Sequence, residues 1–302
     1  MPQATKRSRL FGVLGDPIDH SLSPAMQNAA FAAAGLPHLY LRYRVPPAAL
    51  AGALKSARAL RMGGLNLTVP LKETVLPLLD AITPEARRIG AVNVLTLTPG
   101  GRILGDNTDG RGFLKALGGR VRVRGAHALV IGAGGSARAV ASALAGAGCG
   151  RITIANRTPA RGERLAARIA EKGDAATASV PLRALSRGDV LADADLVVNA
   201  TSLGLSGARL AIRYAAAPRR CLFVDLVYGT RATPFLVGAA RARRRTLDGG
   251  HMLLHQGALA FERWTGRRAP RAAMAGALRA AGLALTEPDA AGTVPPPRPP
   301  TR

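Results

Sequence analysis

The fold class is indicated most clearly by the segment Ala128-Leu129-Val130-Ile131-Gly132-Ala133-Gly134-Gly135-Ser136-Ala137. Its four leading apolar residues predict a short buried strand, and the glycines predict a tight turn that opens a helix to about residue 147. Residues 151–155 predict the next strand, and residues 159–172 the next helix. Strands that alternate with helices are typical of an α/β domain with a mostly parallel sheet.

The same alternation extends in both directions. Further strands are expected at residues 10–15, 39–45, 64–69, 91–97, 196–200 and 221–225, and helices at 24–34, 48–60 and 249–283. The pattern restarts after Asp109, and 302 residues suffice for two domains. We expect an N-terminal α/β substrate domain at residues 9–110, completed by 250–284, and a Rossmann domain at 111–249. The ends, 1–8 and the proline-rich 285–302, are expected to be disordered.

Composition narrows the class of protein. Lys and Arg number 42 against 18 Asp and Glu, a net charge of +24, which raises the possibility of a nucleic-acid partner. The charge is scattered, however, and no nucleic-acid-binding motif accompanies it, so we expect no specific nucleic-acid partner. Two cysteines, Cys149 and Cys221, cannot form a disulfide framework. With no signal-peptide core and no membrane-length apolar run, the sequence predicts a cytoplasmic protein.

The glycine-rich turn predicts a dinucleotide site. It follows a strand and opens a helix, the context in which backbone N–H groups and a helix N-terminus bind a pyrophosphate. The second strand ends in Asn156-Arg157-Thr158, with Arg161 one turn later, where NAD enzymes usually carry a carboxylate. Two guanidiniums there favour the 2′-phosphate of NADP. The alternative makes Thr158 only a helix cap and leaves the arginines in solvent.

Lys72 is the most informative residue in the N-terminal half. It is one of only five lysines, and unlike arginine a lysine can be tuned by its surroundings to release its proton. The alternative is a solvated lysine at a helix start. Other polar residues stand where a plain sheet would not need them, and together they suit a small hydroxylated anion: Ser21, Ser23, Asn66, Thr68, Asn93, Asp109 and Gln256. No metal-ligand spacing is visible, so we expect no metal.

Several blocks, in this order along residues 10–283, together resemble the shikimate dehydrogenase family. They are Gly12-x-x-Gly15-x-Pro17-x-x-His20-Ser21-x-Ser23-Pro24, Asn66-x-Thr68-x-Pro70-x-Lys72, Gly90-Ala91-Val92-Asn93, Asn107-Thr108-Asp109-Gly110, Gly132-Ala133-Gly134-Gly135, Asn156-Arg157-Thr158, Ala200-Thr201-Ser202-x-Gly204, Asp225-x-x-Tyr228 and Met252-Leu253-x-x-Gln256. The resemblance implies an NADP-dependent oxidoreductase that reduces 3-dehydroshikimate to shikimate, on the way to chorismate and the aromatic amino acids.

The resemblance also implies roles for individual residues. Lys72 would protonate the reacting oxygen and Asp109 would hold the lysine. Substrate contacts would come from two sets: Ser21 and Ser23 on the carboxylate, and Asn66, Thr68, Asn93 and Gln256 on the hydroxyls, with Tyr228 nearby. Cofactor contacts would come from Gly132, Ala133, Gly134, Gly135 and Ser136 on the pyrophosphate, Asn156, Arg157, Thr158 and Arg161 on the 2′-phosphate, Leu226 and Gly249 at the nicotinamide, and Thr201.

Departures from the family pattern leave alternatives open. Gln27 stands where a histidine is common and Val94 where a threonine is frequent, and both could widen specificity towards quinate. One alternative to an NADP-dependent shikimate dehydrogenase is therefore a quinate/shikimate dehydrogenase of broader specificity. The other alternative is a basic anion- or nucleic-acid-binding protein that keeps the fold without turnover. Since the family includes monomers and homodimers, the oligomeric state stays open.

Overall fold

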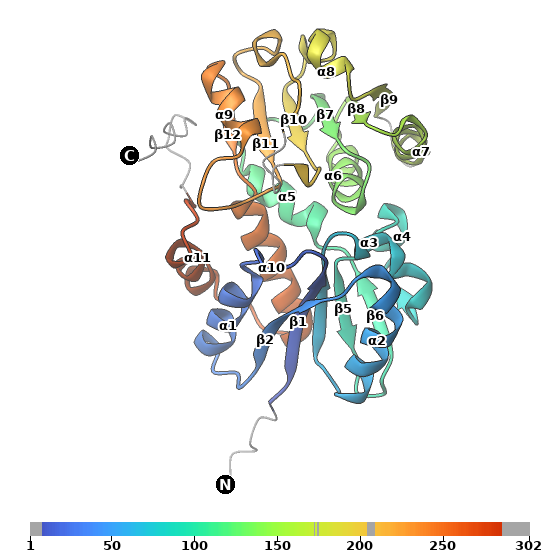
Figure 1. Ribbon diagram of the computed structural model, residues 1–302, viewed down its shortest axis with the longest axis vertical. Helices are drawn as coiled ribbons and strands as arrows, with labels where there is room; N and C mark the ends of the chain where they lie inside the picture. The colour runs from blue at the N-terminus through green and yellow to red at the C-terminus, as the bar shows by residue number, and fades with distance from the viewer. Residues whose placement is uncertain (1–7, 172, 174, 204–208, 286–302) are drawn as a thin grey trace. The chain divides into compact units, whose positions relative to one another are not determined.

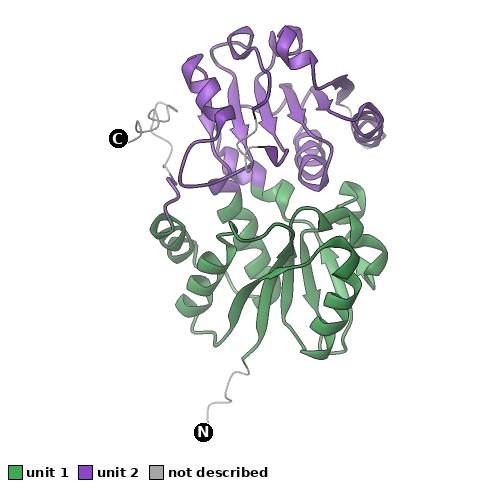
Figure 2. Ribbon diagram, in the orientation of Figure 1, with its two compact units in different colours: residues 1–112, 253–281 green, residues 113–252, 282–302 purple. Residues whose placement is uncertain are grey.

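The chain divides into two compact units, each an α/β fold as predicted. The computed structural model describes residues 8–171, 173, 175–203 and 209–285. Unit 1 comprises Met1–Gly112 with Leu253–Ala281, and unit 2 comprises Phe113–Met252 with Gly282–Arg302 (Figure 2). The predicted disordered ends lie outside the described residues, apart from residues 8 and 285, and so does Gly204.

Unit 1 is built on a six-stranded sheet with the strand order β2-β1-β3-β5-β6-β4 (Figure 1). Its elements are β1 Leu10–Gly15, α1 Ser23–Ala33, β2 Leu39–Arg44, the 3₁₀ helix η1 Pro47–Ala49, α2 Leu50–Ala59, β3 Gly64–Leu67, α3 Leu71–Thr74, the 3₁₀ helix η2 Leu76–Leu78, β4 Ala81–Ile82, α4 Pro84–Ile89, β5 Val94–Leu97, β6 Ile103–Asp106, the first residues of α5 Asp109–Leu117, most of α10 Gly250–Thr265, and α11 Arg271–Ala280.

Strand β5 departs from the expected parallel arrangement. It pairs antiparallel with both β3 and β6, whereas β1 runs parallel to β2 and β3, and β4 runs parallel to β6. The pairing with β6 follows from the Pro-Gly-Gly turn after β5: Gly101 has a φ of +79°, and Thr98 N–H donates to the Arg102 carbonyl oxygen at 2.9 Å. A short turn of this kind reverses the chain into a hairpin. The sequence analysis identified neither the second strand of this hairpin, β6, nor the two-residue strand β4.

The C-terminal helices complete the core of unit 1. The indole Nε1 of Trp264 donates to the carbonyl oxygen of Leu95 at 2.9 Å, and the Trp264 ring lies 5.2 Å from that of Phe11. Gly64 has to be glycine because a Cβ there would overlap the same indole ring. The helical region predicted at 249–283 consists of two helices, because Gly266 adopts a φ of +65° between α10 and α11.

Unit 2 contains a six-stranded sheet, all parallel, with the order β12-β11-β10-β7-β8-β9. Its elements are most of α5, β7 His127–Ile131, α6 Gly135–Gly146, β8 Arg151–Asn156, α7 Pro159–Ala170, β9 Ala176–Pro181, α8 Ala184–Arg187, η3 Asp189–Leu191, β10 Leu196–Asn199, η5 Tyr214–Ala216, β11 Leu222–Asp225, α9 Pro234–Arg241, β12 Arg245–Leu247 and the start of α10. The strands β9 and β12 were not predicted.

The side chains of β7 point alternately to the two faces of the sheet, and helices cover both faces. Ala128 and Val130 pack with α6 and α7, whereas Leu129 and Ile131 pack with α8 and α9. A strand buried on both faces reads as the continuous apolar run seen in the sequence. The carboxyl ends of these parallel strands meet at one edge, where ligands of open α/β sheets bind.

Candidate active site

Lys72 and Asp109 form a buried ion pair in unit 1. The Nζ of Lys72 lies 2.6 Å from Oδ2 of Asp109, and the two side chains are only 11% and 4% exposed. Lys72 sits in the short helix α3 just after β3, and its carbonyl oxygen accepts the N–H of Val92 at 2.8 Å. Asp109 is the first residue of α5. The structure thus brings together the two residues expected to carry proton transfer, and it buries the lysine rather than leaving it in solvent.

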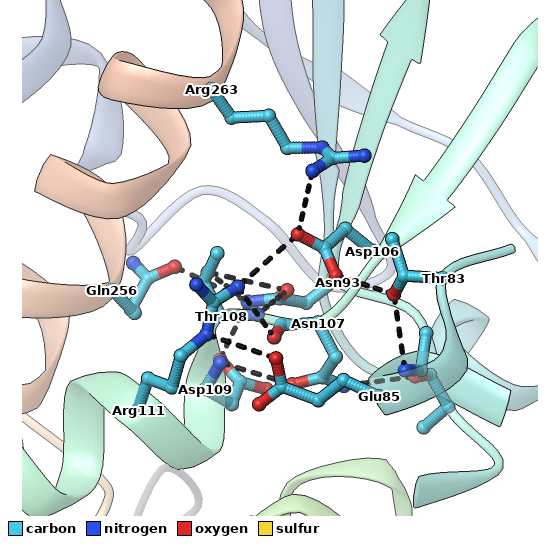
Figure 3. A network of polar contacts seen from close by, with 12 residues as sticks. Thr83, Glu85, Asn93, Asp106, Asn107, Thr108, Asp109, Arg111, Gln256 and Arg263 are labelled. Carbon is cyan, nitrogen blue, oxygen red and sulfur yellow. Dashed lines mark hydrogen bonds and ion pairs between the residues drawn. The ribbon is translucent and has the colours of Figure 1, made fainter. Parts of the chain in front are cut away.

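Asn93 is the centre of the hydrogen-bond network around this pair (Figure 3). Its Nδ2, which carries two hydrogens, has three acceptors within hydrogen-bond distance: Oδ1 of Asp109 at 2.7 Å, Oγ1 of Thr108 at 3.1 Å and Oε1 of Gln256 at 3.3 Å. Its Oδ1 accepts the N–H of Thr108 at 2.8 Å. With donors and acceptors used on both ends, the amide is held in one orientation. Asp109 is consequently fixed by an ion pair on one oxygen and an amide on the other.

Asn66 extends the network into the sheet. Its Nδ2 donates to the carbonyl oxygen of Asn93 at 3.0 Å, and its Oδ1 accepts the hydroxyl of Tyr40 at 2.7 Å. Tyr40, fully buried on β2, was missed by the sequence analysis because nothing in the alternation of β2 distinguishes it. Asn107 was also passed over as a site residue, although its Oδ1 accepts the N–H of Asp109 at 3.0 Å. Its place beside Asp109 in a polar run was the available signal.

The remaining predicted substrate residues of unit 1 lie outside the hydrogen bonds just described. Ser21 and Ser23 are both 7% exposed at the start of α1, and the N–H of Ser23 donates to Oγ of Ser21 at 3.4 Å. Thr68 is half-buried directly after β3, with its N–H bonded to the Leu14 carbonyl oxygen. The N-cap of α1, Leu22, supplies no side-chain hydrogen bond to the first turn. Hydroxyls at a helix start of this kind suit a carboxylate.

In unit 2 the glycine-rich turn has the backbone of a pyrophosphate site. Gly132 adopts a φ of +109°, and a Cβ there would lie 3.2 Å from Cγ2 of Thr201. Gly134 is the N-cap of α6 and offers no side chain to its first-turn N–H groups. Those N–H groups, together with the positive end of the helix dipole, can bind a phosphate. Residues 132–136 could therefore hold the diphosphate of a dinucleotide.

The end of β8 carries the candidate residues for a 2′-phosphate. Nδ2 of Asn156 donates to the Thr158 carbonyl oxygen at 2.8 Å, which shapes the turn into α7. Arg157 and Arg161 are both exposed. Thr158 occupies the N-cap position, but its side chain makes no capping hydrogen bond. Two exposed guanidiniums with no carboxylate at this strand end favour a 2′-phosphate over a free ribose hydroxyl.

Four other predicted residues, Thr201, Leu226, Tyr228 and Gly249, lie beyond the carboxyl ends of β10, β11 and β12. Thr201 Oγ1 donates to Oδ1 of Asn199 at 2.7 Å. A Cβ on Gly249 would overlap the carbonyl oxygen of Leu226, so these two backbones are in direct contact only because residue 249 is glycine. Tyr228 is half-buried in the segment after β11.

Asp225, at the end of β11, ties this edge of unit 2 together. It is fully buried and accepts Nδ2 of Asn199 at 3.0 Å, the N–H of Val227 at 3.1 Å and Oγ1 of Thr233 at 2.5 Å. Burial raises the pKa of this carboxyl to about 6, against the opposing effect of the hydrogen bonds it accepts. Asp225 was part of a recognised block, but its structural role was not predicted.

The described part of the chain contains neither a candidate metal-binding cluster nor a candidate membrane-spanning helix. Within residues 8–171, 173, 175–203 and 209–285, no cluster of three or more His, Cys, Asp or Glu side chains is arranged to hold a metal ion. In the same ranges, no helix combines the length and apolar character needed to cross a membrane.

Comparison with known proteins gives the same family over most of the chain. Three family models match: a shikimate dehydrogenase substrate binding domain at residues 13–95, a shikimate / quinate 5-dehydrogenase at residues 115–226, and a shikimate 5'-dehydrogenase C-terminal domain at residues 251–279. The shikimate dehydrogenase (NADP(+)) of Moorella thermoacetica is 46% identical over 301 residues, which cover 97% of this chain and 100% of that protein.

Solved structures agree with this. The shikimate 5-dehydrogenase of Thermus thermophilus, in complex with NADP(H) and shikimate, is 42% identical with a TM-score of 0.78, covering 90% of this chain and 99% of that one. The quinate dehydrogenase of Corynebacterium glutamicum, in complex with NAD, is 33% identical with a TM-score of 0.79, covering 90% and 99%. From its motifs, its buried lysine–aspartate pair and these relatives, the chain belongs to the shikimate dehydrogenase family.

Proposed function

We propose that this protein is an NADP-dependent shikimate dehydrogenase, which reversibly reduces 3-dehydroshikimate to shikimate in the pathway to chorismate and the aromatic amino acids. The observation that carries the proposal is the Lys72–Asp109 pair at 2.6 Å, held by Asn93 and buried in unit 1. NADPH, when bound, supplies the hydride, so the chain itself has to provide binding, orientation and a proton.

Lys72 supplies that proton. Hydride addition to the ketone carbon leaves negative charge on the oxygen, and an ammonium group neutralises that charge and protonates it to the alcohol. In the oxidation direction the neutral amine takes the hydroxyl proton back. Asp109 holds the ammonium through Oδ2, and Asn93 prevents Asp109 from rotating away by bonding Oδ1. No metal is needed for this balance of one hydride and one proton.

The other substrate contacts follow from donor type. We assign Ser21 and Ser23 to the carboxylate, because hydroxyls at the start of α1 can donate to it. Asn66, Thr68, Asn93 and Gln256 are assigned to the ring hydroxyls, and Tyr228 to a position near the substrate. The 3.3 Å contact between Gln256 and Asn93 supports placing Gln256 in this group.

For the cofactor, we assign Gly132, Ala133, Gly134, Gly135 and Ser136 to the pyrophosphate, and Asn156, Arg157, Thr158 and Arg161 to the 2′-phosphate. Leu226 and Gly249 are assigned to the nicotinamide end, and Thr201 is assigned to the cofactor without a more specific contact. The positive φ of Gly132 and the bare N-cap of α6 support the first group, and the exposure of Arg157 and Arg161 supports the second. We further propose residues 9–110 with 250–284 as the substrate domain, residues 111–249 as the NADP domain, and a cytoplasmic location.

A four-way rate comparison tests this function. Purified protein is given shikimate or quinate with NADP or NAD, and formation of the reduced nicotinamide is followed by absorbance. We expect the highest kcat/KM for shikimate with NADP. Equal or higher kcat/KM for quinate would identify the broader quinate/shikimate enzyme instead. Absence of turnover with all four pairs, together with salt-sensitive binding of DNA that ignores its sequence, would identify a non-catalytic basic protein.

A further inference from the structure

Asp106 is a second buried carboxylate in unit 1, and it has its own set of partners. Its side chain is 4% exposed. Oγ1 of Thr83 donates to Oδ1 at 2.6 Å, while Nη2 of Arg111 and Nη1 of Arg263 lie 3.2 Å and 3.1 Å from Oδ2 (Figure 3). Burying a carboxylate lowers the stability of the fold unless charged or hydrogen-bonding partners compensate for the lost water. Both guanidiniums therefore stabilise Asp106 at this buried position. One carboxylate thereby joins α4, α5 and α10.

Asp106 is also linked directly to the catalytic residues through the backbone. It ends β6, and its carbonyl oxygen accepts the N–H of Asn93 at 3.1 Å. Three residues later the chain reaches Asp109. Between them, Asn107 donates its Nδ2 to the carbonyl oxygen of Ala91 at 2.9 Å and accepts the N–H of Asp109. A shift of Asp106 therefore moves the amide that orients Asp109 and the turn that carries it.

Helix α10 contacts this region at two points on one face. Arg263 follows Gln256 by seven residues, which is about two turns at roughly 3.6 residues per turn, so the two side chains project in similar directions. Gln256 reaches Asn93, and Arg263 reaches Asp106 (Figure 3). The helix lies close to α5, because a Cβ on Gly112 would come 2.7 Å from the backbone nitrogen of Gln256.

We infer that Asp106 and Arg263 are positioning residues for the reaction: their ion pair holds α10 against the end of β6, so that Gln256 and Asn93 keep Asp109 aimed at Lys72. This inference rests on the proposed function of the Lys72–Asp109 pair. Arg111 cannot replace Arg263, because it also pairs with Glu85 at 3.0 Å and its side chain is 44% exposed. Arg263, at 31% exposed, is the more enclosed of the two.

The test removes the charge of Arg263 and retains most of its length. We expect Arg263→Met to lower kcat for shikimate oxidation about tenfold. A displacement of about 1 Å can cost a hundredfold, but Arg111 still pairs with Asp106 in the variant and limits the disturbance at the end of β6. The Kd for NADP should stay within about twofold of the wild-type value, because the cofactor residues are in unit 2. Arg263→Lys should recover most of the lost kcat.

The matched control is Arg58→Met. Arg58 pairs with Asp80 at 2.7 Å, and Asp80 accepts the N–H of Ile103 at the opposite end of β6. This variant also removes an ion pair from unit 1, and its kcat should equal that of wild type. If Arg263→Met keeps wild-type kcat, or if both variants lose kcat equally per folded molecule, the positioning role is overturned.

Hydrogen exchange separates this inference from the proposed function. In Arg263→Met, peptides covering residues 106–112 and 253–262 should exchange faster than in wild type, whereas Arg58→Met should leave them unchanged. A wild-type protein without shikimate turnover would refute the proposed function, and faster exchange confined to Arg263→Met would still support the positioning contact. Unchanged exchange in these peptides would refute the contact whatever the substrate.

Discussion

The candidate substrate site in unit 1 and the candidate cofactor site in unit 2 are built in opposite ways. In unit 1, buried side chains are bonded to one another, and the Lys72 and Asp109 side chains are 11% and 4% exposed. In unit 2, the Gly132–Ser136 turn offers backbone N–H groups, and Arg157 and Arg161 are exposed. One site is organised by its own hydrogen bonds, and the other presents donors that are available to a large anionic ligand.

Because of this difference, we expect mutations in the two sites to change different kinetic and binding constants. Where a proton moves, geometry has to be held before the substrate arrives, because misplacement lowers kcat. Where a cofactor binds and leaves, exposed charges contribute affinity, and their loss appears in Kd or KM.

The largest effect is expected at Lys72. Lys72→Ala removes the proton donor, so kcat should fall by about 10²- to 10⁴-fold, the range typical of a lost general acid. The Kd for NADP, measured by fluorescence titration, should change little. The control is Lys55→Ala, which removes an exposed lysine of α2 and should retain full activity. A Lys72→Ala protein with near-wild-type kcat would show that the Lys72–Asp109 pair is not the proton-transfer centre, and the contrast between the two sites would no longer hold.

An intermediate effect is expected at Arg157. Arg157→Ala should weaken NADP binding by about ten- to a hundredfold, the value of one charge-assisted hydrogen bond, and should leave NAD binding unchanged. The neighbouring control Arg164→Ala removes another exposed arginine of α7 and should alter neither. Equal weakening of NADP and NAD would contradict the 2′-phosphate assignment and indicate a general electrostatic effect.

The smallest effect is expected at Asp225, a buried carboxylate of unit 2 whose pKa rises to about 6. Since the folded pKa exceeds the ordinary value of 3.8, the folded state binds more protons between these values and gains stability as the pH falls. Between pH 7 and pH 5, Asp225 should raise the free energy of unfolding by about 1 kcal/mol. The Asp225→Asn variant should lack this increase.

Urea unfolding of the wild-type protein and of Asp225→Asn at pH 7 and pH 5 gives the change in the free energy of unfolding of each protein. The contribution of Asp225 is the difference between these two changes, because the other titrating groups are common to both proteins. The effect of His127, whose pKa is lowered to about 4 by burial and by Arg151, runs in the opposite direction and is common to both proteins. A wild-type protein and an Asp225→Asn variant with the same pH dependence would show that Asp225 does not titrate in this range.

The sequence predicted most of the fold because strands buried on both faces are apolar runs bounded by glycine. Residues 128–131 and 151–155 became β7 and β8 for this reason. Strand β6, with only four residues including Gly105, carries too little apolar signal, and its antiparallel pairing with β5 depends on the conformation of a turn. The break between α10 and α11 depends in the same way on the positive φ of Gly266.

For the site, the sequence could indicate residue types but not their partners. Lys72 and Asp109 stand out as polar residues in short motifs, yet their 2.6 Å contact joins segments 37 residues apart. Tyr40 gives no local signal, because its role comes from a hydrogen bond to Asn66 on another strand. Arg263 reads as an ordinary surface arginine of α10 until Asp106 is seen opposite it.

The discontinuous composition of unit 1 has a consequence for synthesis on the ribosome. Residues 1–112 emerge first, but Trp264, which packs against Phe11 and occupies the space beside Gly64, is made much later. At roughly 5 to 20 residues per second, the intervening stretch of about 150 residues takes on the order of ten to thirty seconds to translate. During this time an aromatic surface of the nascent chain stays uncovered, and we expect it to be the part of the protein that depends most on chaperones.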